Sequence, residues 1–247
     1  MVTTKKINSA CLVIIGNEIL SGRTHDTNIN HIAQELFICG LSLQLVVVIP
    51  DQKKIIISQI RKLKNQYDFV ITTGGIGPTH DDITSESISL AVKKKYKLHN
   101  GAYKELKKYY RKIKSELTDA RMKMAYMPEG SKLILNKVSG APGFKIENIY
   151  VFAGIPSIVQ AMMKEFKKMI KIKNKFYSTT ISTKLFESKI AHLLVQAERK
   201  YKNISIGSYP IFDGKPKGVE IVINSQVNKL GVSNAKKFIL REINKII

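Results

Sequence analysis

The sequence predicts an α/β domain, in which a parallel sheet lies between two layers of helices, followed by a small α+β domain. Three observations predict this architecture. Short apolar runs alternate with amphipathic stretches as far as residue 170, as strands alternate with helices. The runs are apolar at nearly every position, which is typical of parallel strands covered on both faces. A basic break at residues 171–175 ends the pattern, so we expect domains at residues 1–172 and 173–247.

The elements of the first domain follow from the period of the apolar residues. Strands are predicted at residues 10–15, 43–49, 69–73, 132–135 and 148–153. Helices are predicted at residues 27–39, 52–65, 82–94 and 156–170, with a lysine-rich helical pair at 100–126 that breaks near 117–119. Gly40 stops the first helix, Pro50 closes the second strand, and Pro156 is well tolerated in the first turn of its helix.

The second domain has a different order of elements. Its pattern is β, α, β, β, α, predicted at residues 177–183, 187–200, 204–209, 218–224 and 234–246. This order implies antiparallel strands in a small α+β unit.

The bulk composition excludes several classes of protein. The longest apolar runs are far shorter than the roughly 20 residues that span a bilayer, so we expect no membrane span. The polar N-terminus has no cleavage site before the first strand, which favours a cytoplasmic chain. Two cysteines, Cys11 and Cys39, provide neither a disulfide scaffold nor a four-ligand zinc site, and buried thiols are expected.

The formal net charge of +22 invites a nucleic-acid interpretation, but the kind of basic residue argues against it. Of the 41 basic residues, 35 are lysine and 6 are arginine, and they are scattered along helical faces. Specific nucleic-acid sites favour arginine, because its guanidinium makes bidentate contacts. A general attraction for small anionic substrates is the better interpretation.

Ligands of an open parallel sheet bind beyond the carboxyl ends of its strands, so the polar residues that follow each strand are the candidates for a site. Asn17, Glu18, Asp26 and Asn28 follow the first strand, and Asp51 follows the second. Helix capping explains Asp51, Asp26 and Asn28 equally well. No G-x-S-x-G elbow, Walker loop or dinucleotide G-x-G-x-x-G motif is present.

The densest segment follows the third strand and runs from Thr72 to Thr84. Its glycines let the backbone approach a ligand closely, and the helix after them adds a positive end that favours phosphate. Asp81 and Asp82 would repel a bare phosphate, and their presence makes sense if a divalent cation lies between them and the phosphates. Capping of the helix could explain one of the two aspartates but not both.

These residues resemble a known family. The segment T-G-G-I-G-P-T-H-D-D-I-T at residues 73–84 is similar to the signature of the competence/damage-inducible protein A (CinA) family, whose N-terminal domain belongs to the MoaB/Mog molybdopterin-binding superfamily. Residues 16–22 and 26–28 resemble that family's opening motif. Residues 140–143 and 154–156 resemble its later motifs, and residues 187–191 and 206–210 are similar in the second domain.

The resemblance implies a three-layer α/β/α MoaB/Mog-like domain with a small accessory domain. It implies metal-dependent hydrolysis of a nucleotide pyrophosphate such as ADP-ribose or FAD, with Asp51, Asp82 and Glu18 in catalysis and a divalent Mg, Mn, Co or Ni ion on Asp51, Asp81 and Asp82. The implied substrate and phosphate contacts are Gly74, Gly75, Gly77, Thr79, Asn28, Gly140, Pro142 and Gly143. The family's members form homo-oligomers, which implies a dimer or trimer.

Two departures from the family pattern bear on function. Many members have an aspartate where this chain has Asn17, and longer members continue into an amidohydrolase domain for which residues 1–247 have no counterpart. Two alternatives to hydrolysis stay open. One is a binding module for molybdopterin or a nucleotide, and the other is adenylyl transfer in molybdenum-cofactor biosynthesis.

Overall fold

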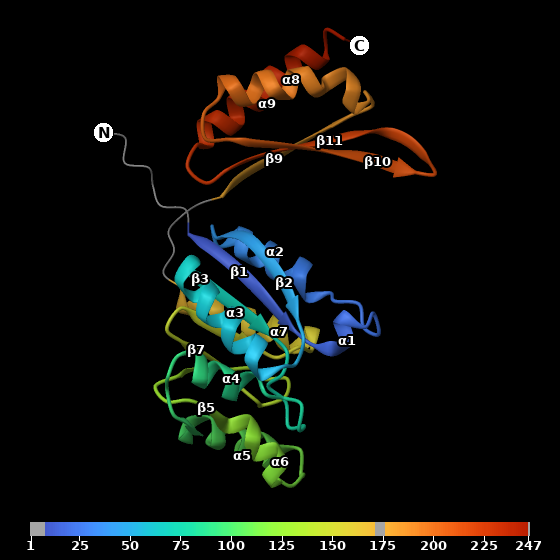
Figure 1. Ribbon diagram of the computed structural model, residues 1–247. Coiled ribbons are helices and arrows are strands. Elements are labelled where there is room, and N and C mark those ends of the chain that lie inside the picture. Colours follow the sequence, from blue (N-terminus) through green and yellow to red (C-terminus); the bar gives the residue numbers. More distant parts are fainter. Residues whose placement is uncertain (1–7, 171–175, 247) are drawn as a thin grey trace, which may run out of the picture. The chain divides into compact units, whose positions relative to one another are not determined.

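The computed structural model describes residues 8–170 and 176–246, which form two compact units (Figure 1). The first unit contains residues 8–37 and 41–171, and the second contains most of the later residues. The predicted boundary at residues 171–175 lies outside the described residues. Independent folding of residues 1–172 and 173–247 stays a prediction. No helix within the described ranges is long and apolar enough to cross a membrane.

The first unit is built on a six-stranded sheet in the order β2-β1-β3-β8-β7-β6. The strands are β1 (Ser9–Ile15), β2 (Ser42–Ile49), β3 (Phe69–Thr73), β6 (Lys132–Ile134), β7 (Gly143–Ile146) and β8 (Ile149–Phe152). β1, β2, β3 and β8 are parallel, whereas β7 and β6 are antiparallel to their neighbours. The sheet is therefore mixed. The expectation of parallel strands holds for β2, β1, β3 and β8 and is wrong for β7 and β6.

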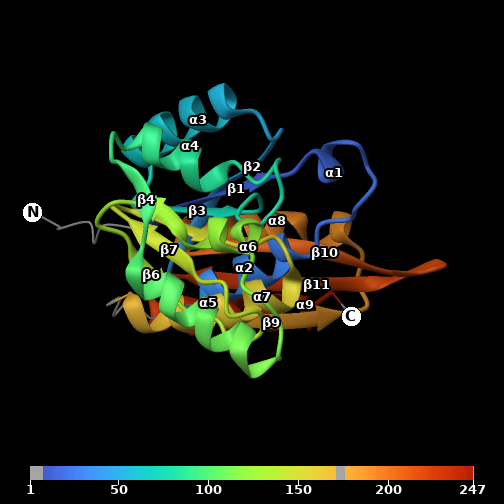
Figure 2. The same cartoon turned by 90° about the horizontal axis from the view of Figure 1, so that it is seen from below.

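Helices cover both faces of this sheet, which confirms the three-layer α/β/α class (Figure 2). The helices are α2 (Asn28–Ile38), α3 (Lys53–Gln66), α4 (Thr84–Ala91), α5 (Asn100–Lys112) and α7 (Pro156–Met169). Side chains of α3, α4 and α5 share one core with Cys11, Val13 and Ile15 of β1. On the opposite face, Phe166 of α7 packs edge-on against Tyr150 of β8, with ring centroids 4.8 Å apart. Alternate residues of a strand point to opposite faces, so buried residues on both faces require strands that are apolar throughout.

The chain between α4 and β6 departs most from the prediction. Only the first member of the predicted helical pair, α5, is a full helix. It is followed by the single turns α6 (Asp119–Met122) and η1 (Lys123–Ala125). Two short strands that the apolar pattern does not reveal, β4 (Tyr96–Leu98) and β5 (Tyr126–Pro128), pair antiparallel. Strands of three residues are too short to establish a period of two.

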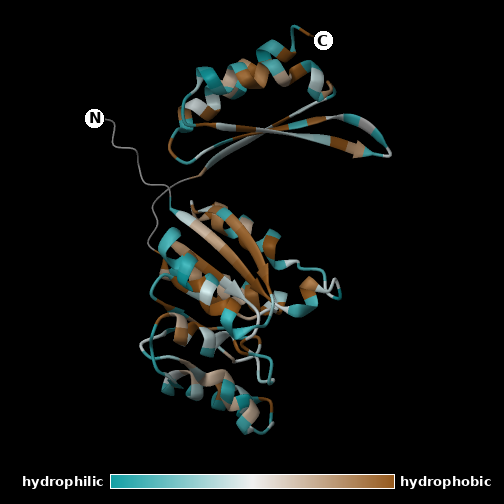
Figure 3. Ribbon diagram, in the orientation of Figure 1, coloured by the Kyte–Doolittle hydropathy of each residue, from teal (hydrophilic) through white to brown (hydrophobic). Residues whose placement is uncertain are grey.

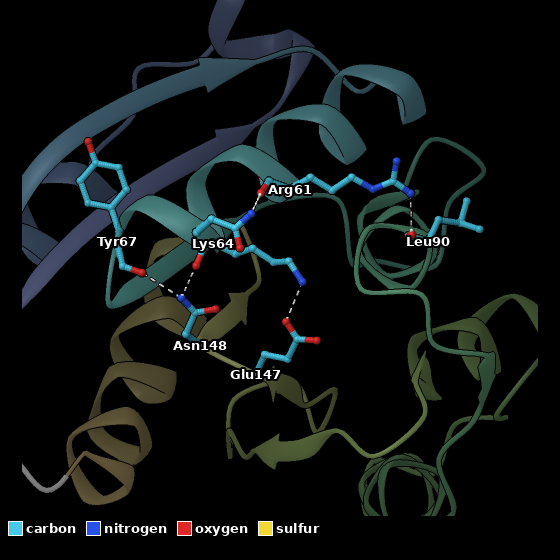
Figure 4. A network of polar contacts seen from close by, with 7 residues as sticks. Arg61, Lys64, Tyr67, Leu90, Glu147 and Asn148 are labelled. Atoms are coloured by element: carbon cyan, nitrogen blue, oxygen red, sulfur yellow. Dashed lines mark hydrogen bonds and ion pairs between the residues drawn. The ribbon is translucent and has the colours of Figure 1, made fainter.

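The two-residue turn between β7 and β8 anchors the end of α3 (Figure 4). The Asn148 side-chain amide donates to the carbonyls of Lys64, at 2.9 Å, and Tyr67, at 2.8 Å. The Lys64 ammonium in turn forms an ion pair of 2.8 Å with Glu147. These bonds satisfy carbonyls that the end of a helix otherwise leaves without partners.

The second unit is a three-stranded antiparallel sheet, in the order β10-β11-β9, with two helices against it. Its elements are β9 (Tyr177–Thr183), α8 (Glu187–Lys200), β10 (Ser205–Asp213), β11 (Lys215–Ser225) and α9 (Lys229–Ile243). Ile181, Val219 and Ile221 pack on Ile190 and Ile239 of the helices. Burial alternates along β9 and β11, where Ile181, Ile221 and Ile223 are buried against the helices, and Figure 3 shows hydrophobic and hydrophilic segments along these strands. The predicted β-α-β-β-α order is observed.

Candidate functional site

The central cavity lies where the strand order of the first unit reverses. β1 has β2 on one side and β3 on the other, so the chain crosses β1 between those two strands. The register pairs Ile14 with Thr73 and Thr73 with Phe152, so β1, β3 and β8 end at the same level. The loops after these strands diverge at such a reversal and leave a crevice between them.

The cavity has a volume of about 540 Å³, within the usual range for a small-molecule site. Its walls combine isoleucines with a few polar groups from the loops after β1, β3 and β8. Six residues predicted for the site line it: Glu18, Asn28, Gly74, Gly75, Gly77 and Asp82.

Glycine is required at the start of the loop after β3. Gly74 has φ +97°, and a Cβ atom there would lie 2.1 Å from the carbonyl oxygen of Ile15. Gly75 has φ +68°, and its Cβ would lie 2.2 Å from Oγ1 of Thr84. The Gly74 N–H donates to the Phe152 carbonyl at 3.2 Å, so it completes the sheet. The close approach of this loop to β1 and α4 thus depends on the absence of side chains.

Asp82 is held in the wall of the cavity by Thr79. One carboxylate oxygen of Asp82 accepts from the Thr79 N–H at 2.8 Å and from the Thr79 hydroxyl at 2.5 Å. The same hydroxyl lies 2.5 Å from Asp81, and this contact lowers the pKa of the Asp81 carboxyl. The N-cap residue of α4 is Ile83, so capping does not explain either aspartate. Thr79 and Asp81 themselves are not among the residues that line the cavity.

Asp51 lies beside the cavity and ties two loops together. Its carboxylate accepts from the Asn17 N–H at 2.8 Å, which fixes the start of α1 (Asn17–Leu20) against the end of β2. The N-cap residue of α3 is Gln52, so the capping interpretation of Asp51 is wrong. Burial raises the pKa of Asp51, the Asn17 bond opposes this, and the nearby carboxylates of Glu18, Asp81 and Asp82 raise it further.

The carboxylates of this region do not form a closed metal site. Among residues 8–170 and 176–246, no group of three or more His, Cys, Asp or Glu side chains is arranged to hold a metal ion. Yet the carboxylates of Glu18, Asp81 and Asp82 are near enough to raise the pKa of Asp51, so negative charge accumulates beside the cavity. Mg²⁺ is usually bound by one or two carboxylates together with the phosphates of a ligand. The carboxylates of this region fit such a shared cation better than a site made of protein groups alone.

The remaining predicted residues have other surroundings. The Asn28 amide donates to the Gly154 carbonyl at 2.7 Å and so joins the loop after β1 to the loop after β8. Gly140, Pro142 and Gly143 do not line the cavity, although their neighbours Ser139 and Ala141 do. Gly143 is in β7, where a Cβ would lie 2.2 Å from the Val151 carbonyl oxygen, so close packing accounts for this glycine.

Sequence reasoning missed one wall of the cavity. Tyr110 of α5 and Met124 of η1 line it, although the sequence predicts only a lysine-rich helical pair in this stretch and no part of a site. The Arg121 guanidinium lies over the Tyr110 ring, 4.5 Å from its centroid, and is held by the Ser115 hydroxyl at 2.8 Å. Tyr110 and Met124 do not come directly after a strand of the six-stranded sheet, and only the apolar face of α5 could have indicated Tyr110.

Residues 11–172 match the family described as a probable molybdopterin binding domain. The chain belongs to this molybdopterin-binding family. The family match covers the whole candidate site, and residues 175–247 match a second family, the FAD synthase middle domain. The crystal structure of the protein CinA from Thermoplasma acidophilum, of unknown function, is similar to the molybdopterin-binding domain. It has a TM-score of 0.60 and 30% identity, over 66% of this chain and 97% of that one. The resemblance to the CinA family is confirmed.

Relatives of this chain occur in archaea. A protein of Archaeoglobus fulgidus is 35% identical over 201 residues, which are 81% of this chain and 84% of the relative. A protein of Caldivirga maquilingensis is 33% identical over 233 residues, or 91% of this chain and 89% of the relative. Both matches are longer than the first unit.

Proposed function

We propose that the protein binds a pyrophosphate-containing nucleotide or molybdopterin derivative in the central cavity and hydrolyses its pyrophosphate. The observation that carries the proposal is the 540 Å³ cavity at the strand reversal, with a glycine loop and Asp82 in one wall. The match of the second unit to the middle domain of FAD synthase makes an FAD-like or ADP-ribose-like dinucleotide the first substrate to test.

The glycine loop suits the phosphates. The Gly74 N–H is used in the sheet, so the N–H groups of Gly75 and Gly77 are the donors that we assign to a pyrophosphate. Both glycines line the cavity, and α4 begins soon after them with its positive end. Thr73, which lines the cavity, adds a hydroxyl that is buried and lacks a hydrogen-bond partner among the described residues, as expected of a group that awaits a ligand.

The apolar part of the cavity suits a planar ring. Ile19, Ile76 and Tyr110 line it, and Arg121 supports the Tyr110 ring from outside the lining. An adenine, flavin or pterin ring buries apolar faces against such groups and gains stacking energy on a tyrosine.

Hydrolysis requires a water molecule beside the bound pyrophosphate. Water adds to one phosphorus atom, the bridging P–O bond breaks, and ADP-ribose yields AMP and ribose 5-phosphate. We assign Asp82 and Glu18 to this reaction, since both face the cavity, with Glu18 as a base for the water. Asp51 acts by positioning the loop at Asn17 and by adding negative charge beside Asp82.

A divalent cation, Mg, Mn, Co or Ni, is part of the proposal. Asp51 and Asp82, with Asp81 beside them, would hold it together with the phosphates. The ion would neutralise phosphate charge and lower the pKa of a bound water.

The alternative is binding without hydrolysis, or adenylyl transfer to a molybdopterin.

Release of AMP from ADP-ribose and from FAD, with and without Mg²⁺ or Mn²⁺, tests the proposal. Thermal denaturation with the same ligands detects binding separately, since a ligand of the folded state raises the midpoint by mass action. Metal-dependent AMP release supports hydrolysis. Stabilisation without AMP release would refute hydrolysis and leave the binding function.

A further inference from the structure

A small pocket of about 220 Å³ lies between α8 and α9 of the second unit (Figure 1). Its lining comes from these two helices and from the residue that ends α8. The lining residues are Lys200, Tyr201, Asn234, Lys237, Phe238 and Arg241. Three of them are cationic and none is acidic, and neither the sequence motifs nor the proposed function accounts for them.

Aromatic rings hold two of the three cations in place. The Lys200 ammonium lies 5.1 Å from the centre of the Phe238 ring and 5.6 Å from the centre of the Tyr201 ring. The Arg241 guanidinium lies 5.8 Å from the centre of the same Phe238 ring. The two rings pack edge to face, with centroids 6.2 Å apart. A ring attracts a cation without accepting its N–H groups in ordinary hydrogen bonds, so these donors stay available to an anion.

The positive charge of the pocket is only partly compensated. Arg241 pairs with Glu242 at 2.9 Å, and Glu242 also pairs with Lys245 at 2.8 Å. Within the part of the chain that the structure describes, Lys200 and Lys237 have no carboxylate at ion-pair distance. Cations gathered around one ring repel each other, and an anion bound between them would replace this repulsion by attraction.

Helix stability explains only one of these cations. Lys200 is in the last turn of α8, where a cation is favourable beside the negative end of the helix. Lys237 lies in the middle of α9, where the ends of the helix have no such effect. Asn234, Lys237, Phe238 and Arg241 are spaced as neighbours on one helix face, so that an amide donor joins the cations.

The size of the pocket selects a small anion. Drug-sized ligands fill about 300–1,000 Å³, so a pocket of about 220 Å³ has no room for a whole nucleotide. Single-stranded nucleic acid needs a basic groove that follows several nucleotides, and this pocket ends within two helices. Phosphate and pyrophosphate are compact and highly charged, and their oxygens accept from lysine, arginine and amide donors.

We infer that the pocket between α8 and α9 binds a small phosphate anion, which is either free phosphate or pyrophosphate or the terminal phosphate group of a small molecule. The inference is independent of the proposed function, because it rests on residues of the second unit alone.

Titration of the protein with phosphate and pyrophosphate, followed by the NMR signals of its backbone amides, tests this pocket separately from the central cavity. The pocket variant combines Lys200→Gln with Lys237→Gln, at exposed positions where folding should be unaffected. The matched control combines Lys189→Gln with Lys229→Gln. It removes the same charge from exposed positions of the same two helices, outside the pocket. Circular dichroism verifies that each variant is folded.

We expect the amide signals of residues 234–241 to shift in the wild-type protein and in the control, with pyrophosphate bound more tightly than phosphate because it carries more charge. The pocket variant should bind pyrophosphate at these residues at least about tenfold more weakly, through the loss of two charge-assisted hydrogen bonds, and the control should stay within about twofold. Shifts with AMP but not with adenosine would show that the terminal phosphate of a small molecule is accepted. Shifts with the inorganic anions alone would assign the free anion.

Three results would overturn the inference. The first is an absence of shifts at residues 234–241 of the wild-type protein in millimolar pyrophosphate, and the second is equal weakening in the pocket variant and the control. The third is tighter binding of a short single-stranded oligothymidine than of pyrophosphate at these residues, which would assign the pocket to nucleic acid. The signals of residues 74–77 report on the central cavity, so failure of the proposed function is detected separately.

Discussion

Replacement of Gly74 by alanine should destabilise the first unit strongly, because two penalties combine at this position. An alanine at φ +97° is in the left-handed region, at a cost of roughly 1–2 kcal/mol. Its Cβ would also lie 2.1 Å from the Ile15 carbonyl oxygen, which belongs to the backbone of β1 and cannot rotate away. Either β1 or the glycine loop must then move by about an ångström, and we expect a total loss of about 3–5 kcal/mol.

Gly22→Ala provides a matched control, because Gly22 has φ +71° but no atom within 4 Å of an added Cβ. This variant should lose only the conformational part, roughly 1–2 kcal/mol. The midpoint of thermal unfolding, measured by circular dichroism or calorimetry, should fall by about 2–4 °C per kcal/mol in a chain of this size. Gly74→Ala should therefore melt on the order of 10 °C below wild type, and Gly22→Ala only a few degrees below. Equal shifts in the two variants would refute the idea that close approach of the loop to β1 requires this glycine.

Three further predictions concern the packing of the first unit. Phe166→Ala should lower the free energy of unfolding by about 3–5 kcal/mol, since the buried ring stacks edge-on with Tyr150, and a loss below about 1 kcal/mol in chemical denaturation would contradict this packing. Asn148→Ala should lower it by about 1–3 kcal/mol through two lost bonds at the end of α3, whereas Asn65→Ala, with one exposed bond on the same helix, should change it by less than about 1 kcal/mol. Burial raises the pKa of the Cys11 thiol from 9.0 to about 12, so its contribution to stability is complete below pH 9 and declines between pH 9 and 12 as the unfolded thiol ionises. Wild-type protein should accordingly lose stability more steeply than Cys11→Ala over that range, and parallel pH curves would contradict the shift.

The fold was predictable wherever an element was long enough to show its period. The strand at residues 69–73 and the helix at 187–200 have the predicted bounds, because continuous burial or a clear apolar face defines them. β7 was not predicted, because it begins at Gly143 and its four residues are too few to show a period. Pairing direction depends on the turn at Glu147 and Asn148, which composition alone does not reveal. The mixed sheet follows from that turn.

The two cysteines show how local context limits a prediction. Cys11 lies within β1 and is fully buried, as expected for a residue inside an apolar strand. Cys39 lies beyond the end of α2 and is only half-buried, so the expectation of a second buried thiol is wrong. Helix ends lie at the surface more often than strand interiors, and the periodic face of α2 ends before Cys39.

The candidate site was predictable along the edge of the sheet and not beyond it. Strand ends brought Glu18, Gly75 and Asp82 to one cavity, as the rule for parallel sheets requires. Tyr110 reaches the same cavity from α5, which is separated from β3 by α4 and β4. Its position depends on tertiary packing, to which a single sequence gives no direct access.

Release of AMP from ADP-ribose by Asp82→Asn tests the central claim most directly. The substitution keeps the shape of a side chain that lines the central cavity and removes its charge. Asp213→Asn, which removes an exposed carboxylate in the second unit, is the control. The account predicts metal-dependent AMP release by wild type and Asp213→Asn at similar rates, and a loss of about 100-fold or more in Asp82→Asn. AMP release at the wild-type rate by Asp82→Asn would contradict it.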